Sequence, residues 1–122
     1  MKAGLLKLKL QLACGDGFAL GPGKADLLDA IGRDGSISAA ARALGMSYRR
    51  AWLLTDEMNR CFAERLVETA PGRGRSGGAR LTAAGREALA AYRELEAEAA
   101  RLADHPAYRR LAARLRSDPL PH

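Results

Sequence analysis

Hydrophobic and polar residues alternate near the start of the chain. Leucine occupies every second position from Leu6 to Leu12, and Lys or Gln stands at each position between them. A period of two predicts a half-buried β-strand over these residues. Gly15-Asp16-Gly17 then predicts a turn, after which Phe18-Ala19-Leu20 returns as the second strand of a hairpin.

After Gly21-Pro22-Gly23 the apolar residues recur every three or four positions, which predicts helices. The first predicted helix covers 23–33 and buries Leu27, Leu28 and Ile31. The second is capped by Ser38 and runs to about Leu44, where Gly45 supplies the left-handed residue that ends many helices. Its apolar stripe consists of Ile37, Ala40, Ala41 and Leu44.

A third helix is predicted to begin at Ser47, which is again a good capping residue. Its inner face would consist of Ala51, Leu54 or Thr55, Met58 and Phe62. Trp52 lies beside this apolar stripe, so we expect its ring to pack against the hydrophobic core. Residues 66–69 and 79–81 then predict two strands of a second hairpin, with a loop over 71–78.

Thr82 is predicted to cap a long final helix. Its apolar positions have the alternating spacing of four and three that is typical of a heptad repeat, namely Leu81, Gly85, Ala88, Tyr92, Leu95, Ala99 and Leu102. The first turns of such a helix would pack on their own domain. The pattern continues beyond what a small core can cover, which favours a homodimer interface that includes Tyr92, Leu95, Ala99 and Leu102. His105-Pro106 is expected to end the helix.

Positive charge is concentrated in two segments of this basic chain, whose net charge is +6. Residues 35–55 and 69–86 contain no acidic residue, whereas 87–104 is net acidic. A basic surplus of this kind predicts an anionic partner. The arginines of the two basic segments are Arg42, Arg49, Arg50, Arg73, Arg75, Arg80 and Arg86.

Other kinds of chemistry have little support in the sequence. Two cysteines and two histidines show no metal-site spacing, so we expect neither a metal nor a cofactor. The glycines of 72–77 match a dinucleotide-binding pattern, but a strand rather than a helix is predicted after them. No Ser–His or Cys–His arrangement is apparent, and no apolar run is long enough to span a membrane. We therefore expect a cytoplasmic protein that is not an enzyme.

Two short helices joined by a tight turn are typical of a helix-turn-helix. In that motif the amino-terminal part of the second helix enters the major groove of DNA. Arg49 and Arg50 lie in this part of the predicted third helix. An arginine there can bind guanine O6 and N7, or a phosphate.

The motif GSISAAARALGMSYRRAWLLTDEMN, followed by LVET, a Gly-rich loop and LTAAG, closely resembles the amino-terminal DNA-binding domain of the ModE family of molybdate-responsive regulators. A looser similarity extends to the LysR-type winged helix, and the resemblance covers roughly residues 4–100. It implies a winged helix-turn-helix fold, mostly α with a small antiparallel β hairpin or sheet, in a dimeric cytoplasmic regulator. ModE-family proteins continue into small β-barrel domains that bind molybdate. The present sequence ends at His122, so we expect no direct molybdate binding.

Together these features predict one structural domain whose winged helix-turn-helix core spans 1–81. The helix-turn-helix covers about 36–62, with a recognition helix at 47–60, and the wing covers about 66–81. Residues 82–122 form carboxy-terminal helices for dimerisation. The predicted contacts to double-stranded DNA are Ser36, Ser38, Arg42, Ser47, Tyr48, Arg49, Arg50, Arg73, Arg75 and Arg80. Two alternatives remain open, a winged-helix module that binds an acidic protein and an RNA-binding protein that uses the Arg- and Gly-rich loop.

Overall fold

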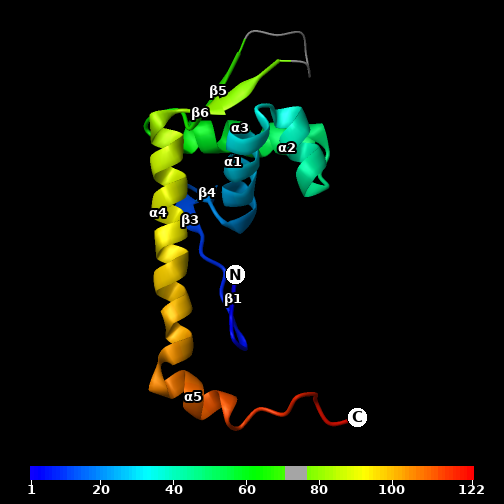
Figure 1. Cartoon of the computed structure of the whole chain (residues 1–122), viewed down its shortest axis with the longest axis vertical. Coiled ribbons are helices and arrows are strands. Elements are labelled where there is room, and N and C mark those ends of the chain that lie inside the picture. The colour runs from blue at the N-terminus through cyan, green and yellow to red at the C-terminus, as the bar shows by residue number, and fades with distance from the viewer. Residues whose placement is uncertain (71–76) are drawn as a thin grey trace.

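A computed structural model of the chain describes residues 1–70 and 77–122 (Figure 1). The described residues form mostly helices, with three two-stranded antiparallel sheets. The elements in chain order are β1 (Lys2–Ala3), β2 (Leu6–Lys7), β3 (Leu12–Cys14), β4 (Gly17–Leu20), α1 (Pro22–Asp34), α2 (Ile37–Leu44), α3 (Tyr48–Cys61), β5 (Val67–Thr69), β6 (Ala79–Leu81), α4 (Ala83–Ala100), the 3-10 helix η2 (Arg101–Asp104) and α5 (Pro106–Ala112).

Helix α1 lies at the centre of the core. It begins with Pro22, whose fixed φ suits the first turn of a helix, and it ends at Gly35, which has a φ of 78°. Leu27, Leu28 and Ile31 are fully buried, as the apolar spacing predicted. Helices α2, α3 and α4 and strands β4 and β6 all contact α1, so one apolar face organises the surrounding elements.

Helices α2 and α3 are joined by the predicted tight turn. Gly45 adopts a φ of 66° and ends α2, and the Met46 N–H donates to the Ala41 carbonyl at 3.0 Å. The Ser47 hydroxyl accepts from the Arg50 N–H and caps α3 as expected. The predicted Ser38 cap of α2 is wrong. Ser36 has the extended backbone of a cap and its hydroxyl accepts from the Ala39 N–H, so the cap of α2 lies two residues earlier than predicted.

Strands β5 and β6 form the wing hairpin, with Val67 opposite Leu81 and Glu68 opposite Arg80. Asn59 near the end of α3 attaches β5 to the helix, because its side-chain oxygen accepts from the N–H groups of Leu66 and Val67 and its amide donates to the Val67 carbonyl. Most of the predicted loop, including Arg73 and Arg75, lies outside the described residues.

The continuous strand predicted over 6–12 is wrong. Gly4, with a φ of 60°, turns the chain so that β1 pairs with β2, and only 12–14 pair with β4. Residues 8–11 connect these two hairpins. The alternation predicted one long strand, but β4 has too few residues to pair with all of it. Leu10 still packs against the core, although it does not belong to a strand.

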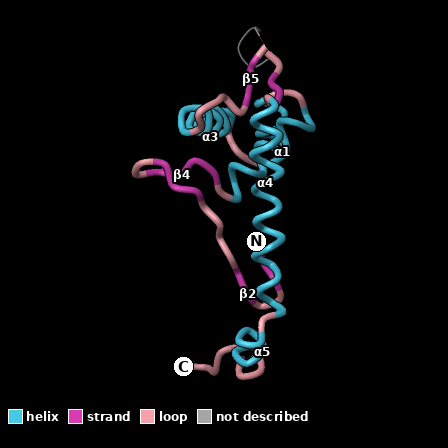
Figure 2. Tube along the Cα trace, turned by 90° about the vertical axis from the view of Figure 1, so that its left-hand side faces the viewer, coloured by secondary structure: helices cyan, strands magenta, loops and turns pink. Residues whose placement is uncertain are grey.

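The first half of α4 is attached to the core, and the second half extends beyond it (Figure 2). Tyr92 is buried and donates to the Leu10 carbonyl at 2.9 Å, and burial raises the pKa of its phenol. Arg93 pairs with Asp26 of α1 at 3.0 Å. Near the far end the Leu5 N–H donates to the Tyr108 hydroxyl at 2.8 Å, so the β1–β2 hairpin lies against the carboxy-terminal helices.

Gly85 in the first turn of α4 tests how closely this helix meets the wing. A Cβ at this position would overlap the Leu66 carbonyl oxygen, which also accepts from the Thr82 N–H at 2.9 Å. We expect Gly85→Ala to lower the free energy of unfolding by about 1–3 kcal/mol, because backbone atoms must move to relieve the overlap. Gly23→Ala, in the first turn of α1, is the matched control because no atom lies within 4 Å of its added Cβ. Urea unfolding that gave the two variants equal stability would contradict this packing.

Candidate nucleic-acid interface

Helix α3 has a buried face and an exposed face. Ala51, Thr55 and Met58 are buried against the core, in agreement with the predicted inner face. With 3.6 residues per turn, Arg49, Leu53 and Arg60 lie on the opposite face, and all three are exposed. The core therefore holds α3 by one side and leaves the other side available for a partner.

The amino-terminal turn of α3 combines a cap with two exposed cations. The Ser47 hydroxyl is 3.0 Å from the Arg50 nitrogen, and the other N–H groups of this turn carry the partial positive charge of the helix end. Across residues 1–70 and 77–122, no carboxylate pairs with Arg49 or Arg50. Tyr48 is half-buried, and its ring packs against the core. This capped turn is thus a positively charged surface suited to an anion or to base edges.

The acidic residues of α3 are neutralised by neighbouring cations. Asp56 lies 3.7 Å from Arg60, and Glu57 forms an ion pair with the buried Lys24 of α1. The two carboxylates of α3 therefore do little to weaken the positive potential at its amino end.

Near the other end of α3, the Cys14 and Cys61 thiols are free, and the hydrogen bond between them raises the pKa of the Cys61 thiol.

Helix α2 contributes polar side chains of a different kind. The Ser36 hydroxyl is occupied as the helix cap. The Ser38 hydroxyl accepts from the exposed Arg42 guanidinium at 3.2 Å. These predicted site residues occupy the start and the exposed side of α2, so they lie at the same end of the molecule as α3 and the wing (Figure 1).

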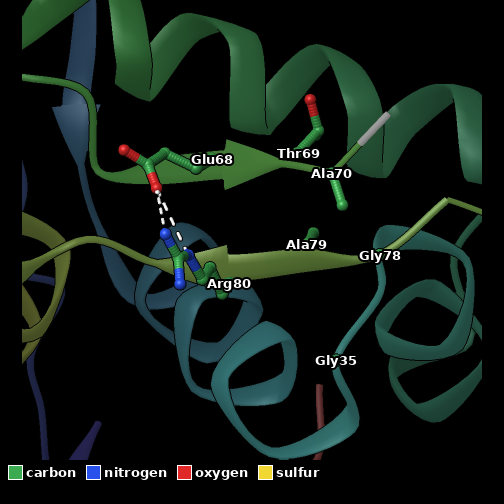
Figure 3. Close-up of a pocket in the computed structure, with 7 residues that line it drawn as sticks. All are labelled: Gly35, Glu68, Thr69, Ala70, Gly78, Ala79 and Arg80. Carbon is green, nitrogen blue, oxygen red and sulfur yellow. Dashed lines mark hydrogen bonds and ion pairs between the residues drawn. The ribbon is translucent and has the colours of Figure 1, made fainter. Parts of the chain in front are cut away.

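Arg80 of the wing is less available than the sequence suggested. Its guanidinium pairs with Glu68 on the neighbouring strand at 3.1 Å (Figure 3). A hollow of about 470 Å³ lies beside this pair, between the wing and Gly35. The segment 69–86 contains no acid, but strand pairing brings Glu68 opposite Arg80 and partly neutralises it.

Two apolar residues of α3 are exposed although the sequence analysis did not predict it. Trp52 is 46% exposed, so the expectation that it packs against the core is wrong. Leu53 is 47% exposed and belongs to neither predicted face. A helical projection centred on Ala51 and Thr55 would have placed Leu53 on the side facing away from the core.

A family comparison matches the core elements that present this surface. Residues 24–86, just over half of the chain, match the family described as bacterial regulatory helix-turn-helix proteins of the LysR family. The chain belongs to this LysR family. The matched range includes α2, α3, β5 and β6, so the arrangement is a LysR-type winged helix-turn-helix.

Similarity to individual proteins is consistent with ModE-like regulators. The chain is 49% identical over 86 residues to the molybdenum-pterin-binding protein MopB of Rhodobacter capsulatus, which covers 70% of this chain and 32% of that protein. It is 44% identical over 82 residues to the molybdenum transport protein ModE of Azotobacter vinelandii, covering 67% of this chain and 30% of the relative. Identity to the DNA-binding transcriptional dual regulator ModE of Escherichia coli K12 is 42% over 88 residues, covering 72% and 32%. The chain thus spans about a third of the length of these relatives.

None of the helices in the described part of the chain has the length and apolarity needed to cross a bilayer. Among the same residues, no three His, Cys, Asp or Glu side chains gather in a way that would hold a metal ion.

Serine substitutions test the assignment of the two caps. We expect Ser36→Ala and Ser47→Ala each to lower the free energy of unfolding by about 1 kcal/mol, because each leaves a helix N–H without its side-chain acceptor. Ser38→Ala is the matched control and should change stability by less than about 0.5 kcal/mol, since it loses only an exposed contact with Arg42. Thermal unfolding in which Ser38→Ala costs more than Ser36→Ala would reverse the assignment.

Proposed function

We propose that this chain is a sequence-specific DNA-binding transcriptional regulator that acts in the cytoplasm as a homodimer. The observation that carries the proposal is the amino-terminal turn of α3. Arg49 and Arg50 are exposed there beside the Ser47 cap, on a helix whose opposite face is fixed in the core. Membership of a family of helix-turn-helix regulators supports the same assignment.

In this proposal α3 lies in the major groove and its first turn contacts base edges. A guanidinium can bind guanine O6 and N7 in a bidentate manner, which gives base discrimination. Ser36, Ser38 and Arg42 would lie beside the phosphate backbone, where hydroxyls, guanidinium groups and helix N-termini bind phosphate. Ser47 and Tyr48 would position the arginines, since the first caps the helix and the second packs on the core.

The wing would contact the phosphate backbone. Arg73 and Arg75 are assigned to this contact from the sequence, because they lie outside the described residues. Arg80 would contribute less, since it shares its charge with Glu68.

The second half of α4 and the following 3-10 helix η2 would form the dimer interface. Leu95 is 52% exposed and Leu102 is 46% exposed, although both belong to the heptad pattern whose earlier members pack on the core. Ala99 and Tyr92 were also predicted for this interface and lie on the same side of the helix, but Tyr92 is 2% exposed because it packs on its own core, so it offers a second copy little surface. Residues 82–122 would thus place two winged cores, residues 1–81, at a fixed separation on two operator half-sites.

The names of the relatives MopB and ModE refer to molybdenum, which suggests that the regulated genes concern this metal. The absence of direct molybdate binding by this chain stays a prediction.

Arginine substitutions test the division between base and phosphate contacts. We expect Arg49→Ala or Arg50→Ala to weaken operator binding by about 1–3 kcal/mol and to reduce the preference for operator over scrambled duplex. The double variant Arg73→Ala/Arg75→Ala should weaken both duplexes equally and reduce the salt dependence by about one counterion per contact. Fluorescence anisotropy at several salt concentrations measures both quantities.

Arg110→Ala is the matched control because Arg110 is an exposed arginine on α5, far from α3 in the structure (Figure 1). Loss of sequence preference in the wing variant, with preference retained in both α3 variants, would reverse the proposed roles. Failure of every duplex to compete for this surface at physiological salt would favour a module that binds an acidic protein instead.

Glutamate substitutions test the dimer. We expect Leu95→Glu/Leu102→Glu to give monomers, because burying unpaired carboxylates between two helices is costly. Leu120→Glu, which is also exposed but lies in the carboxy-terminal tail, should remain dimeric. Sedimentation equilibrium that found the unsubstituted chain monomeric at tens of micromolar, roughly the range of a weak but useful interface, would contradict the proposal.

A further inference from the structure

A leucine occupies the centre of the exposed face of α3. Leu53 follows Arg49 by four residues, so the two side chains lie one above the other on the same face. Nearly half of its surface is exposed, and it does not belong to the core cluster, whereas the adjacent Leu54 packs against that cluster. Leu53 therefore leaves about half of its apolar surface open on this face of α3.

The residues around Leu53 make this position locally apolar within a positive surface. Arg49 and Arg50 lie one turn before it, and no carboxylate of the described residues pairs with them. Asp56 and Glu57 lie one turn after it, but Arg60 and Lys24 neutralise them. If α3 lies in the major groove, DNA offers this leucine one complementary group, because the C5-methyl group of thymine is the apolar group that base pairs display there.

We propose that Leu53 contacts the C5-methyl group of a thymine and so determines the preferred base at one position of each half-site. This inference rests on the proposed function, because it requires α3 to lie in the major groove. Four residues of helix rise about 6 Å, which corresponds to roughly two base pairs of B-DNA. The thymine therefore lies within about two base pairs of the base contacted by Arg49.

Deoxyuridine provides a test, because it differs from thymidine only by the missing methyl group. The preferred duplex is first selected from a random pool with the unsubstituted protein, and each thymine is then replaced singly by deoxyuridine. Fluorescence anisotropy should show a loss of affinity of about fourfold at one thymine of each half-site, the effect of removing one buried methyl group. The other replacements should have little effect.

Leucine variants connect this loss to Leu53. We expect Leu53→Ala to weaken binding to the thymine duplex by at least a similar factor and to bind the thymine and deoxyuridine duplexes equally well. Leu53→Met keeps an apolar side chain of similar size and should retain the sensitivity to the methyl group. Leu120→Ala is the matched control and should behave like the unsubstituted protein, since Leu120 is exposed in the tail.

The possible failures are distinguishable. If a preferred duplex is selected but every deoxyuridine replacement is neutral, or if Leu53→Ala keeps the sensitivity, the role of Leu53 is wrong and the proposed function stands. If Leu53→Ala sediments as a monomer, Leu53 belongs to a protein interface and the assignment is again overturned. If no duplex is preferred over the pool, the proposed function and this inference fail together.

Discussion

Burial of the apolar face of α1 is the constraint on which the rest of the structure depends. Leu27, Leu28 and Ile31 are removed from water completely, and each such side chain contributes about 1.5–3 kcal/mol. The elements that cover this face are α2, α3, α4, β4 and β6. The same contacts that stabilise the core therefore fix the position of α3 and of the wing, and Gly45 sets the sharp turn between α2 and α3.

The surface chemistry of α3 follows from this arrangement. Ala51, Thr55 and Met58 make the contacts between α3 and the core. The residues on the opposite side of the helix are therefore not needed for packing and can be used to bind a partner. Arg49 at the capped end and Leu53 one turn later occupy that side, with Arg50 on its flank, while cations pair with the carboxylates of Asp56 and Glu57. Asn59 links the far end of α3 to the wing strand, so α3 and the wing are held together as one unit.

Much of the fold was predictable because the spacing of apolar residues and the turn and capping residues indicate the same helices that the core buries. The spacing of Leu27, Leu28 and Ile31 identified α1, and Gly45 and Ser47 identified the turn between α2 and α3. Predictions failed where the outcome depends on neighbours distant in sequence. The choice between Ser36 and Ser38 depends on backbone angles that the preceding turn imposes, and Arg80 is neutralised by Glu68 only through strand pairing. The exposure of Leu53, by contrast, follows from the predicted inner face of α3, and only Trp52, at the edge of that face, depends on how closely the neighbouring elements approach it.

The most direct test of the central claim is a methylation-protection experiment with dimethyl sulfate on the preferred duplex. This reagent modifies guanine N7 in the major groove and adenine N3 in the minor groove. The proposed function predicts protection of guanine N7 in two half-sites about one helical turn apart, as expected for a dimer with α3 in the major groove. Protection confined to adenine N3, with guanine N7 as reactive as in free DNA, would contradict the placement of α3 in the major groove.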